Sequence, residues 1–192
     1  MVSAIYVDME RGPYPALLGA DACWGVGRDA RRFDGAGPVV AHPPCGPWGS
    51  MRQFCTRQDR SLAPIAVKQV LEHGGVLEHP AASTLWKHCG LPAPFQWIPL
   101  AAPRVWSLMV EQVRWGHPCR KRTKLLIVGA SARDVPPFPA PREPTHHIGG
   151  DKAWRETVAK PRGMKVLDNK GEGHLTPPAF ARWLIQIAQA CA

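Results

Sequence analysis

The sequence predicts an α/β fold in which most strands of a single sheet run parallel. Short apolar runs of strand length alternate with segments of helical periodicity. One of these runs leads into a proline turn that ends on a cysteine and another into a glutamate followed by proline, as expected where strands of a parallel sheet give way to loops. At 192 residues the chain is expected to form one domain.

The amino-terminal part is expected to supply two strands with acidic ends. Residues 3–8 have the pattern of a first strand ending on Asp8, and residues 9–15, which include Gly12 and Pro13, have the character of a loop over a site. Residues 23–27 can form a second strand that closes on Asp29. An acid at this end of a strand is where nucleotide-like cofactors often meet a ribose hydroxyl, although such carboxylates are as often simply solvated.

A third strand leads into the turn around which the chain is organised. Residues 38–48 read Pro-Val-Val-Ala-His-Pro-Pro-Cys-Gly-Pro-Trp, a short apolar run followed by consecutive prolines. Pro43 and Pro44 restrict the backbone of the turn and remove two amide donors. The turn therefore holds Cys45 at the carboxyl end of a strand, where open α/β sheets place their chemistry. The alternative is a buried structural cysteine, which is the usual state of a free cysteine.

A helix and a fourth strand follow. Residues 59–73 have helical periodicity, and the glycines at 74 and 75 end the helix. Val76 and Leu77 form a short strand that runs into Glu78, His79 and Pro80. Because the carboxyl ends of parallel strands lie at one edge of the sheet, we expect Glu78 to lie near Cys45, with the chemistry between them.

The second half of the chain contains a basic strand start. Residues 81–88 are expected to form a short helix, residues 91–103 a proline-rich connector, and residues 104–112 and 125–129 two more strands. Four cations precede the last of these strands: Arg120, Lys121, Arg122 and Lys124. Such a run is usually a solvated face. Here it enters a central strand, and buried cations need partners, so a phosphate-binding or substrate-binding role is favoured.

Residues 130–175 are rich in proline, glycine and basic residues, and they predict a loop-rich insertion. This insertion includes Lys152 and Arg155 and is a candidate nucleic-acid-facing arm. The chain ends in a helix over residues 179–190, whose start is marked by Thr176, Pro177 and a second proline.

The composition indicates a basic protein in a reducing compartment. Lys and Arg number 24 against 15 Asp and Glu, a net charge of +9, which favours a polyanionic partner and nucleic acid before a membrane surface. The six cysteines have no disulfide-framework spacing, and we see neither a secretory signal nor a membrane-length apolar run, so a cytoplasmic setting is expected. No His/Cys pair has the usual spacing of a metal site, so no metal is expected, and the histidines beside prolines are interpreted as shaping turns.

In their order, these segments resemble the DNA cytosine-5 methyltransferases, in the reduced form common among small phage and prophage proteins. Pro44-Cys45 after a strand resembles the nucleophile motif of that family, and Glu78-His79-Pro80 stands where the family has Glu-Asn-Val or Glu-Asn-Pro. Lys121 and Thr123 resemble the strand that carries a Gln-x-Arg-x-Arg pattern, and residues 176–181 resemble the last motif beside the cofactor. The resemblance covers residues 38–129 and 174–190, and it implies a reduced Rossmann-like methyltransferase fold.

The resemblance also implies roles for individual residues. It assigns catalysis to Cys45, Glu78, Lys121 and Thr123. It assigns S-adenosylmethionine binding to Asp8, Gly12, Pro13, Asp29, Pro44, Thr176 and Pro177. Contacts with DNA, or with a pyrimidine nucleotide, fall to His79, Arg120, Lys121, Arg122, Lys152 and Arg155. The Phe-x-Gly-x-Gly loop of the family is absent, and Gly46 and His79 replace its Gln and Asn.

The chemistry explains the two principal residue types independently. Pyrimidine C5 is a weak nucleophile until a thiolate adds at C6 and makes the ring enamine-like, which is the role expected of Cys45. A carboxyl group at N3, the role expected of Glu78, lets the ring accept the electrons. The prediction is therefore transfer of a methyl or related one-carbon group to C5, most simply of cytosine in DNA. A catalytically degenerate nucleic-acid-binding module and a pyrimidine-modifying enzyme with a donor other than S-adenosylmethionine remain as alternatives.

Overall fold

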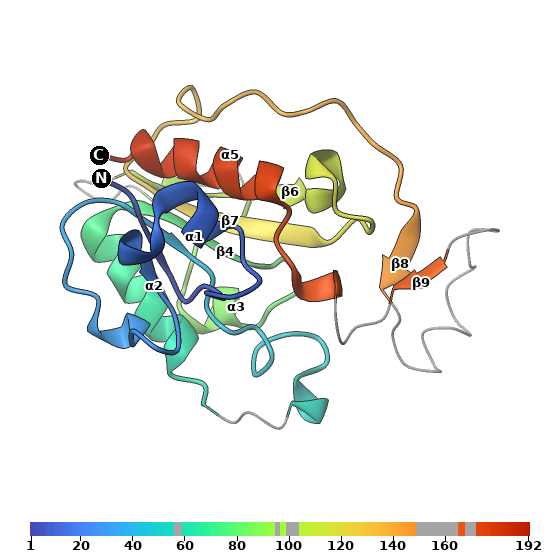
Figure 1. Cartoon of the computed structure of the whole chain (residues 1–192), viewed down its shortest axis with the longest axis horizontal. Helices are drawn as coiled ribbons and strands as arrows, with labels where there is room; N and C mark the ends of the chain where they lie inside the picture. The colour runs from blue at the N-terminus through green and yellow to red at the C-terminus, as the bar shows by residue number, and fades with distance from the viewer. Residues whose placement is uncertain (56–58, 95–96, 99–103, 149–164, 168–171) are drawn as a thin grey trace.

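The computed structural model describes residues 1–55, 59–94, 97–98, 104–148, 165–167 and 172–192 (Figure 1). Seven strands form one sheet in the order β2-β1-β3-β4-β7-β6-β5. They are β1 (Ser3–Ile5), β2 (Cys23–Trp24), β3 (Val39–Ala41), β4 (Gly75–Pro80), β5 (Trp97–Ile98), β6 (Val105–Glu111) and β7 (Arg122–Val128). A separate parallel pair consists of β8 (His146–Ile148) and β9 (Lys165–Leu167).

One strand direction predominates in the sheet. Strands β2, β1, β3 and β4 are mutually parallel. Strand β7 runs antiparallel to β4, and β6 is antiparallel to β7, so β6 points the same way as β4. The α/β class and the mostly parallel sheet are as predicted. Because Pro80 pairs with Thr123, β7 begins at the edge where β4 ends, and the cation run lies at the carboxyl edge.

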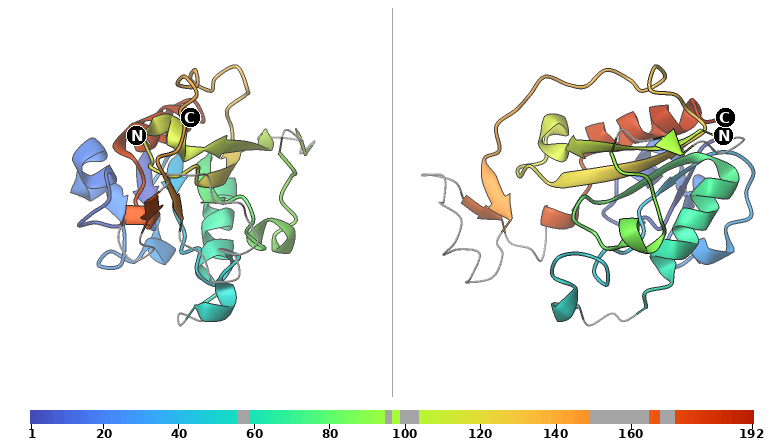
Figure 2. Two further views of the ribbon diagram at one scale, coloured as in Figure 1. Left: turned by 90° about the vertical axis from the view of Figure 1, so that its right-hand side faces the viewer. Right: turned by 180° about the vertical axis from the view of Figure 1, so that it is seen from behind.

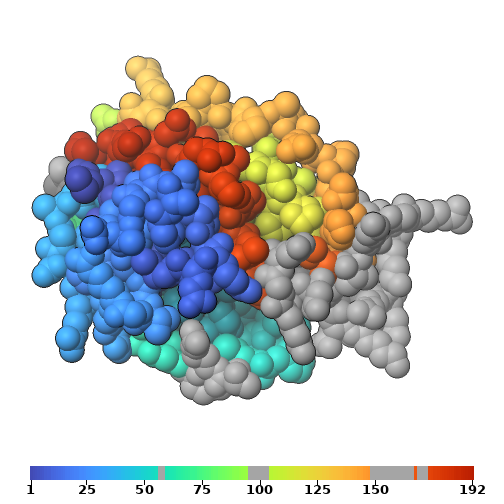
Figure 3. All heavy atoms as spheres, viewed as in Figure 1, coloured from blue at the N-terminus to red at the C-terminus, as the bar shows by residue number. Residues whose placement is uncertain are grey.

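Helices cover both faces of the sheet (Figures 1 and 2). Helix α5 (Pro178–Gln189) and the short α1 (Tyr14–Leu18) pack on one face, and α2 (Leu62–His73) and α3 (Leu85–His88) on the other. The space-filling view shows the amino-terminal segment and α5 side by side (Figure 3). Short 3-10 turns lie at Ala20–Ala22, Ala30–Arg32, Arg52–Phe54, Gln112–Trp115 and Glu172–His174. Among the described residues no helix has the length and apolar character needed to span a bilayer.

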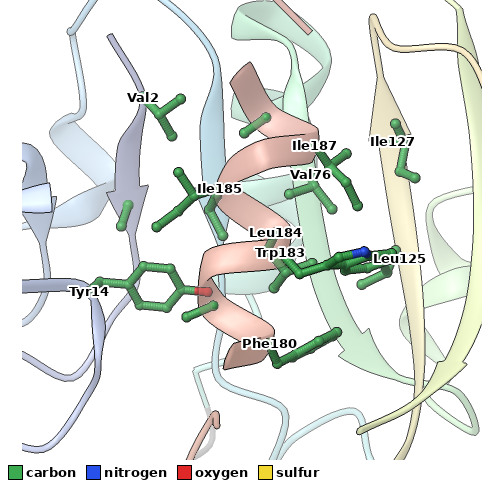
Figure 4. Close-up of a cluster of buried hydrophobic side chains, with 14 of the residues drawn as sticks. Val2, Tyr14, Val76, Leu125, Ile127, Phe180, Trp183, Leu184, Ile185 and Ile187 are labelled. Carbon is green, nitrogen blue, oxygen red and sulfur yellow. The ribbon is translucent and has the colours of Figure 1, made fainter. Parts of the chain in front are cut away.

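Successive side chains of each strand point to opposite faces of the sheet, so apolar residues form one core cluster on each face. On the α5 face, Phe180, Leu184 and Ile187 recur at helical spacing and pack with Val76 of β4, and Tyr14 reaches the same cluster from α1 (Figure 4). The next residues along β4 follow from this alternation. Leu77 lies in the α2-face cluster, Glu78 returns to the α5 face, and His79 faces the α2 side beside Trp86.

Several predicted elements differ in length from those observed. Strand β2 covers only residues 23–24, not 23–27. Strand β4 continues beyond Leu77 through Pro80, because β7 pairs with it along its whole length. Glu78 is therefore fixed within a strand rather than in the turn after it. The predicted insertion over residues 130–175 is largely irregular where it is described, and Lys152 and Arg155 lie outside the described residues.

Candidate active site

The order of the strands creates a crevice at the carboxyl edge of the sheet. From β1 the chain passes to β2 on one side, and it later returns to β3 on the other side of β1. The loops after β1 and β3 therefore diverge, and open α/β sheets bind their ligands at such a switch point. A cavity of about 260 Å³ lies there. Its lining comes from residues 6–8, 11–14, 42–45, 78, 80, 121 and 174–176.

Eight of the sixteen predicted site residues line this cavity. Cys45 follows β3 and Glu78 lies in β4, and both reach it because the two strands are neighbours and parallel. Lys121 joins them from the loop before β7. The other lining residues that the sequence had singled out are Asp8, Gly12, Pro13, Pro44 and Thr176.

Glu78 is the centre of a hydrogen-bond network. Its Oε1 accepts from Gln112 Nε2 at 3.0 Å and from the Thr123 hydroxyl at 3.2 Å, and its Oε2 accepts from His42 Nδ1 at 3.1 Å. Burial acts to raise the pKa of this carboxyl. The hydrogen bond from His42 and the nearby charge of Lys121 outweigh burial and lower the pKa to about 2. Glu78 is therefore an ionised hydrogen-bond acceptor at neutral pH.

Tyr14 continues the network on the other side of His42. The Tyr14 hydroxyl is hydrogen-bonded to His42 Nε2, and the side chains of His42 and Glu78 are only 11% and 12% exposed. Burial, and then the charge of Glu78, raises the pKa of Tyr14 well above its ordinary value, so its hydroxyl keeps its proton. Because the ionised Glu78 accepts from Nδ1–H, the protonated Tyr14 hydroxyl can donate to Nε2, and a ring proton on Nδ1 satisfies both contacts.

Cys45 opens a tight turn. Its carbonyl oxygen accepts from the amides of Trp48 at 3.0 Å and Gly49 at 2.8 Å. A side chain at position 46 would meet the sulfur of Cys55 at 2.7 Å, which explains the glycine there. Burial, and then the charge of Glu78, raises the pKa of the Cys45 thiol, and Lys121 acts to lower it. The thiol is thus protonated at neutral pH and needs a proton acceptor before it can attack.

Backbone strain is concentrated at the same cavity. Among the described residues, Tyr6 and Lys121 are the non-glycine residues with positive φ, at 59° and 37°, and both line it. Lys121 Nζ donates to the carbonyl oxygens of His174 and Leu175, each at 3.2 Å, which ties the start of β7 to the segment before α5. Such conformations are unfavourable and cluster at functional sites, where the surrounding contacts maintain them.

The loop after β1 is wound closely on itself. Asp8 Oδ1 accepts from the amides of Glu10 and Arg11, each at 3.0 Å, and these bonds lower the pKa of Asp8. The amide of Gly12 returns to the Asp8 carbonyl at 3.1 Å. A Cβ at Gly12 would lie 2.3 Å from that oxygen, so only glycine fits. This loop walls the cavity beside β1.

Some predicted site residues do not reach the cavity. The Asp29 carboxylate lies outside its lining and is held by the backbone and guanidinium of Arg31, with the shortest bond at 2.7 Å. His79 is fully buried against Trp86, and burial lowers its pKa to about 4, so the expectation that it contacts nucleic acid does not fit its position. Thr123 is buried behind Glu78, and Pro177 is also outside the lining.

The two arginines beside Lys121 point away from the cavity. The side chains of Arg120 and Arg122 are 53% and 65% exposed, and their acidic neighbours are Glu143 at 3.8 Å and Glu111 at 3.1 Å. Exposed ion pairs of this kind are weak. Both guanidinium groups are therefore accessible to an anion at the edge of the sheet.

Comparison with known proteins adds nothing to this geometry: no family model, curated protein or solved structure matches the chain. Within the described residues, no group of three or more His, Cys, Asp or Glu side chains is placed to hold a metal ion. The cavity brings together a thiol, an ionised carboxylate and a cation. Together these groups allow nucleophilic addition with proton transfer.

Proposed function

We propose that this chain transfers a one-carbon group to C5 of a pyrimidine, most simply cytosine in DNA, through a covalent adduct of Cys45 at C6. The observation that carries the proposal is that Cys45 and Glu78 line one cavity at the switch point of the sheet, with Lys121 beside them. A nucleophile, an ionised carboxylate and a cation in one concave site are the groups that covalent catalysis uses, and this supports the proposal.

The addition step balances within the site. A sulfur lone pair of Cys45 forms the bond to C6, the C5=C6 electrons move to C4–C5, and the C4=N3 electrons move to N3, which takes up a proton. The thiol has lost one proton, so the net change moves a proton from sulfur to N3. We assign the transfer of that proton to Glu78, and one acceptor position of its Oε2 remains for the exocyclic amine.

The neighbours of Glu78 fix its position. Gln112 Nε2 and the Thr123 hydroxyl occupy Oε1, and they are also bonded to each other at 2.9 Å. The carboxylate cannot rotate without breaking these bonds. Lys121 acts to lower the pKa of Cys45 and so favours its thiolate. A base enclosed with these groups must leave the duplex stack.

The donor is S-adenosylmethionine by resemblance alone, within a proposed reduced Rossmann-like fold. Asp8, Gly12, Pro13, Pro44 and Thr176 are in place to hold a donor against the cavity. Asp29, the residue assigned to the ribose, lies outside the cavity lining and is paired with Arg31, so its position does not fit that role. When bound, this cofactor would supply the electrophilic methyl group. The disagreement at Asp29 favours a second candidate, a nucleic-acid-binding module without turnover.

Nucleoside analysis tests the proposal. DNA from cells that make this chain is hydrolysed and compared by mass spectrometry with DNA from cells that lack it. In parallel, purified protein is incubated with DNA in D₂O, since a C6 adduct makes C5 exchange its hydrogen without any donor. We expect a new C5-modified cytosine and deuterium at C5. DNA binding with neither product would support the binding module instead.

The salt dependence of DNA binding tests the role of the exposed arginines. Replacement of Arg120 and Arg122 by glutamine is expected to weaken binding and to reduce the slope of log K against log salt by about 1 to 2, one for each lost phosphate contact. The matched control is Lys68→Gln with Arg133→Gln, which removes the same charge from α2 and from the loop after β7. If both double variants have the same slope, Arg120 and Arg122 do not contact phosphates.

A further inference from the structure

We infer that His42 is a positioning residue which holds, between Tyr14 and Glu78, the proton that passes from the Cys45 thiol to the pyrimidine N3. The inference rests on the proposed function and adds a proton reservoir to it. His42 belongs to none of the motifs that carry the family resemblance, and the sequence alone had indicated a turn-shaping role for it.

The position of His42 follows from the strand that precedes it. Val40 faces α5, and residues two apart on a strand share a face, so His42 is directed to the same side as the cavity. The amide of His42 donates to the Ile5 carbonyl at 3.0 Å, which ties the end of β3 to β1. Both ring nitrogens then have partners in the network, Tyr14 at Nε2 and Glu78 at Nδ1.

A reservoir is needed because neither end of the reaction stores the proton. The thiol must release it before sulfur attacks, and N3 takes it only as the sulfur–carbon bond forms. Glu78 accepts from three donors and favours its ionised form. An imidazole can take a second proton on Nε2, and the Tyr14 hydroxyl can then accept from it instead of donating.

The proposed step is a proton transfer between His42 and Glu78. Solvent in the shared cavity first carries the thiol proton of Cys45 to Nε2 of His42. Protonated His42 then gives the Nδ1 proton to Glu78 Oε2, and Glu78 passes it to N3 while the sulfur–carbon bond forms. His42 remains neutral with its proton on Nε2. When the adduct collapses, the N3 proton returns by the same route. Glu78 is the catalytic residue that touches the ring, and His42 acts through it.

Several titratable and charged groups surround His42. The groups that contact His42 or share its cavity are Tyr14 from α1, Glu78 from β4, Cys45 from the loop after β3, Lys121 from the loop before β7, and the Asp8–Arg11 pair from the loop after β1. His79, on the opposite face of β4, interacts with His42 only electrostatically. Glu78 is the anion in direct contact with the imidazole. Histidine is the side chain whose charge ordinarily changes between pH 5 and 8.

The experiment measures C5 deuterium exchange in DNA from pH 6 to pH 10. His42→Asn retains an amide N–H that can replace Nδ1 against Glu78, but it cannot take up a proton. We expect a loss of about 100-fold at pH 7. The loss should shrink as pH rises, because hydroxide then removes the thiol proton. His73→Asn, at the end of α2 and outside the cavity lining, is the matched control and should behave as wild type.

A uniform loss at every pH would overturn the inference, because a structural role has no such dependence. If His42→Asn does not fold, Tyr14→Phe tests the same pair: it should lose about tenfold at pH 7 with the same trend, and a pH-independent loss would likewise overturn it. Failure of the proposed function is distinguishable, because the wild-type chain would then show no exchange at any pH.

Discussion

Cys45→Ser is expected to abolish C5 exchange and product formation, with a loss of at least about a thousandfold, while DNA binding changes little. The substitution exchanges one sulfur for one oxygen and leaves the turn intact, because the turn is held by the backbone carbonyl of residue 45. A serine hydroxyl beside the ionised Glu78 is far harder to deprotonate than a thiol. Exchange rates and filter-binding affinities on the same DNA measure the two effects.

Cys55→Ser provides the control for this substitution. Cys55 lies against Gly46, close to the proposed nucleophile, but it is outside the cavity lining. Its substitution is expected to leave exchange within about threefold of wild type, the ordinary range for a side chain without a chemical role. Activity in Cys45→Ser, or loss of activity in Cys55→Ser alone, would reassign the nucleophile.

The parts of the site that the sequence predicted are those set by strand direction. Cys45 and Glu78 follow or end apolar runs in neighbouring parallel strands, and that is sufficient to place them at one edge. Lys121 precedes β7 and reaches the same edge because β7 runs antiparallel to β4, which the sequence did not reveal. The strand-direction logic also anticipated Asp8 there. It required no knowledge of side-chain packing, which is why it succeeded from a single sequence.

The parts that the sequence could not predict depend on contacts between distant segments. Tyr14 meets His42 across 28 residues of chain, and Gln112 meets Glu78 across 34. No local pattern encodes these pairings. The signal that was available for His42 is its register: it is two residues beyond Val40, which faces α5.

Two predicted site residues lie outside the cavity for local reasons. Asp29 was assigned to a ribose because it follows a strand, but Arg31, two residues later, occupies its carboxylate. His79 was assigned to nucleic acid because it follows Glu78, but adjacent residues of a strand face opposite sides. Extension of β4 through Pro80 makes that alternation apply, and the apparent turn in the sequence concealed it.

Glu78→Gln is expected to separate two properties of the site in opposite directions. C5 exchange should fall by about 100- to 1,000-fold, because the amide cannot pass a proton to N3. At the same time the Cys45 thiol should become more reactive, because the charge that raises its pKa is gone. Alkylation of the Cys45 peptide by iodoacetamide at pH 7.5 should therefore be severalfold faster than in wild type.

The same substitution also removes a pH-dependent stabilisation of the fold. The pKa of Glu78 is lowered from 4.5 to about 2, so its contribution to stability is present above pH 4.5 and is lost as pH falls toward 2. Glu78→Gln lacks this dependence, and its amide nitrogen also faces one of the donors that held the carboxylate, at a cost of about 1–3 kcal/mol. Thermal melts at pH 3 and pH 7 should therefore differ less for the variant than for wild type.

Glu111→Gln is the control, because Glu111 pairs with Arg122 outside the cavity lining and its loss should alter neither the exchange rate nor the thiol. A slower exchange together with a faster thiol in Glu78→Gln cannot arise from general misfolding, which would expose every cysteine peptide alike. It requires that one carboxylate acts both on the ring and on Cys45. Loss of exchange with unchanged alkylation of Cys45 would instead place Glu78 too far from the sulfur for this mechanism.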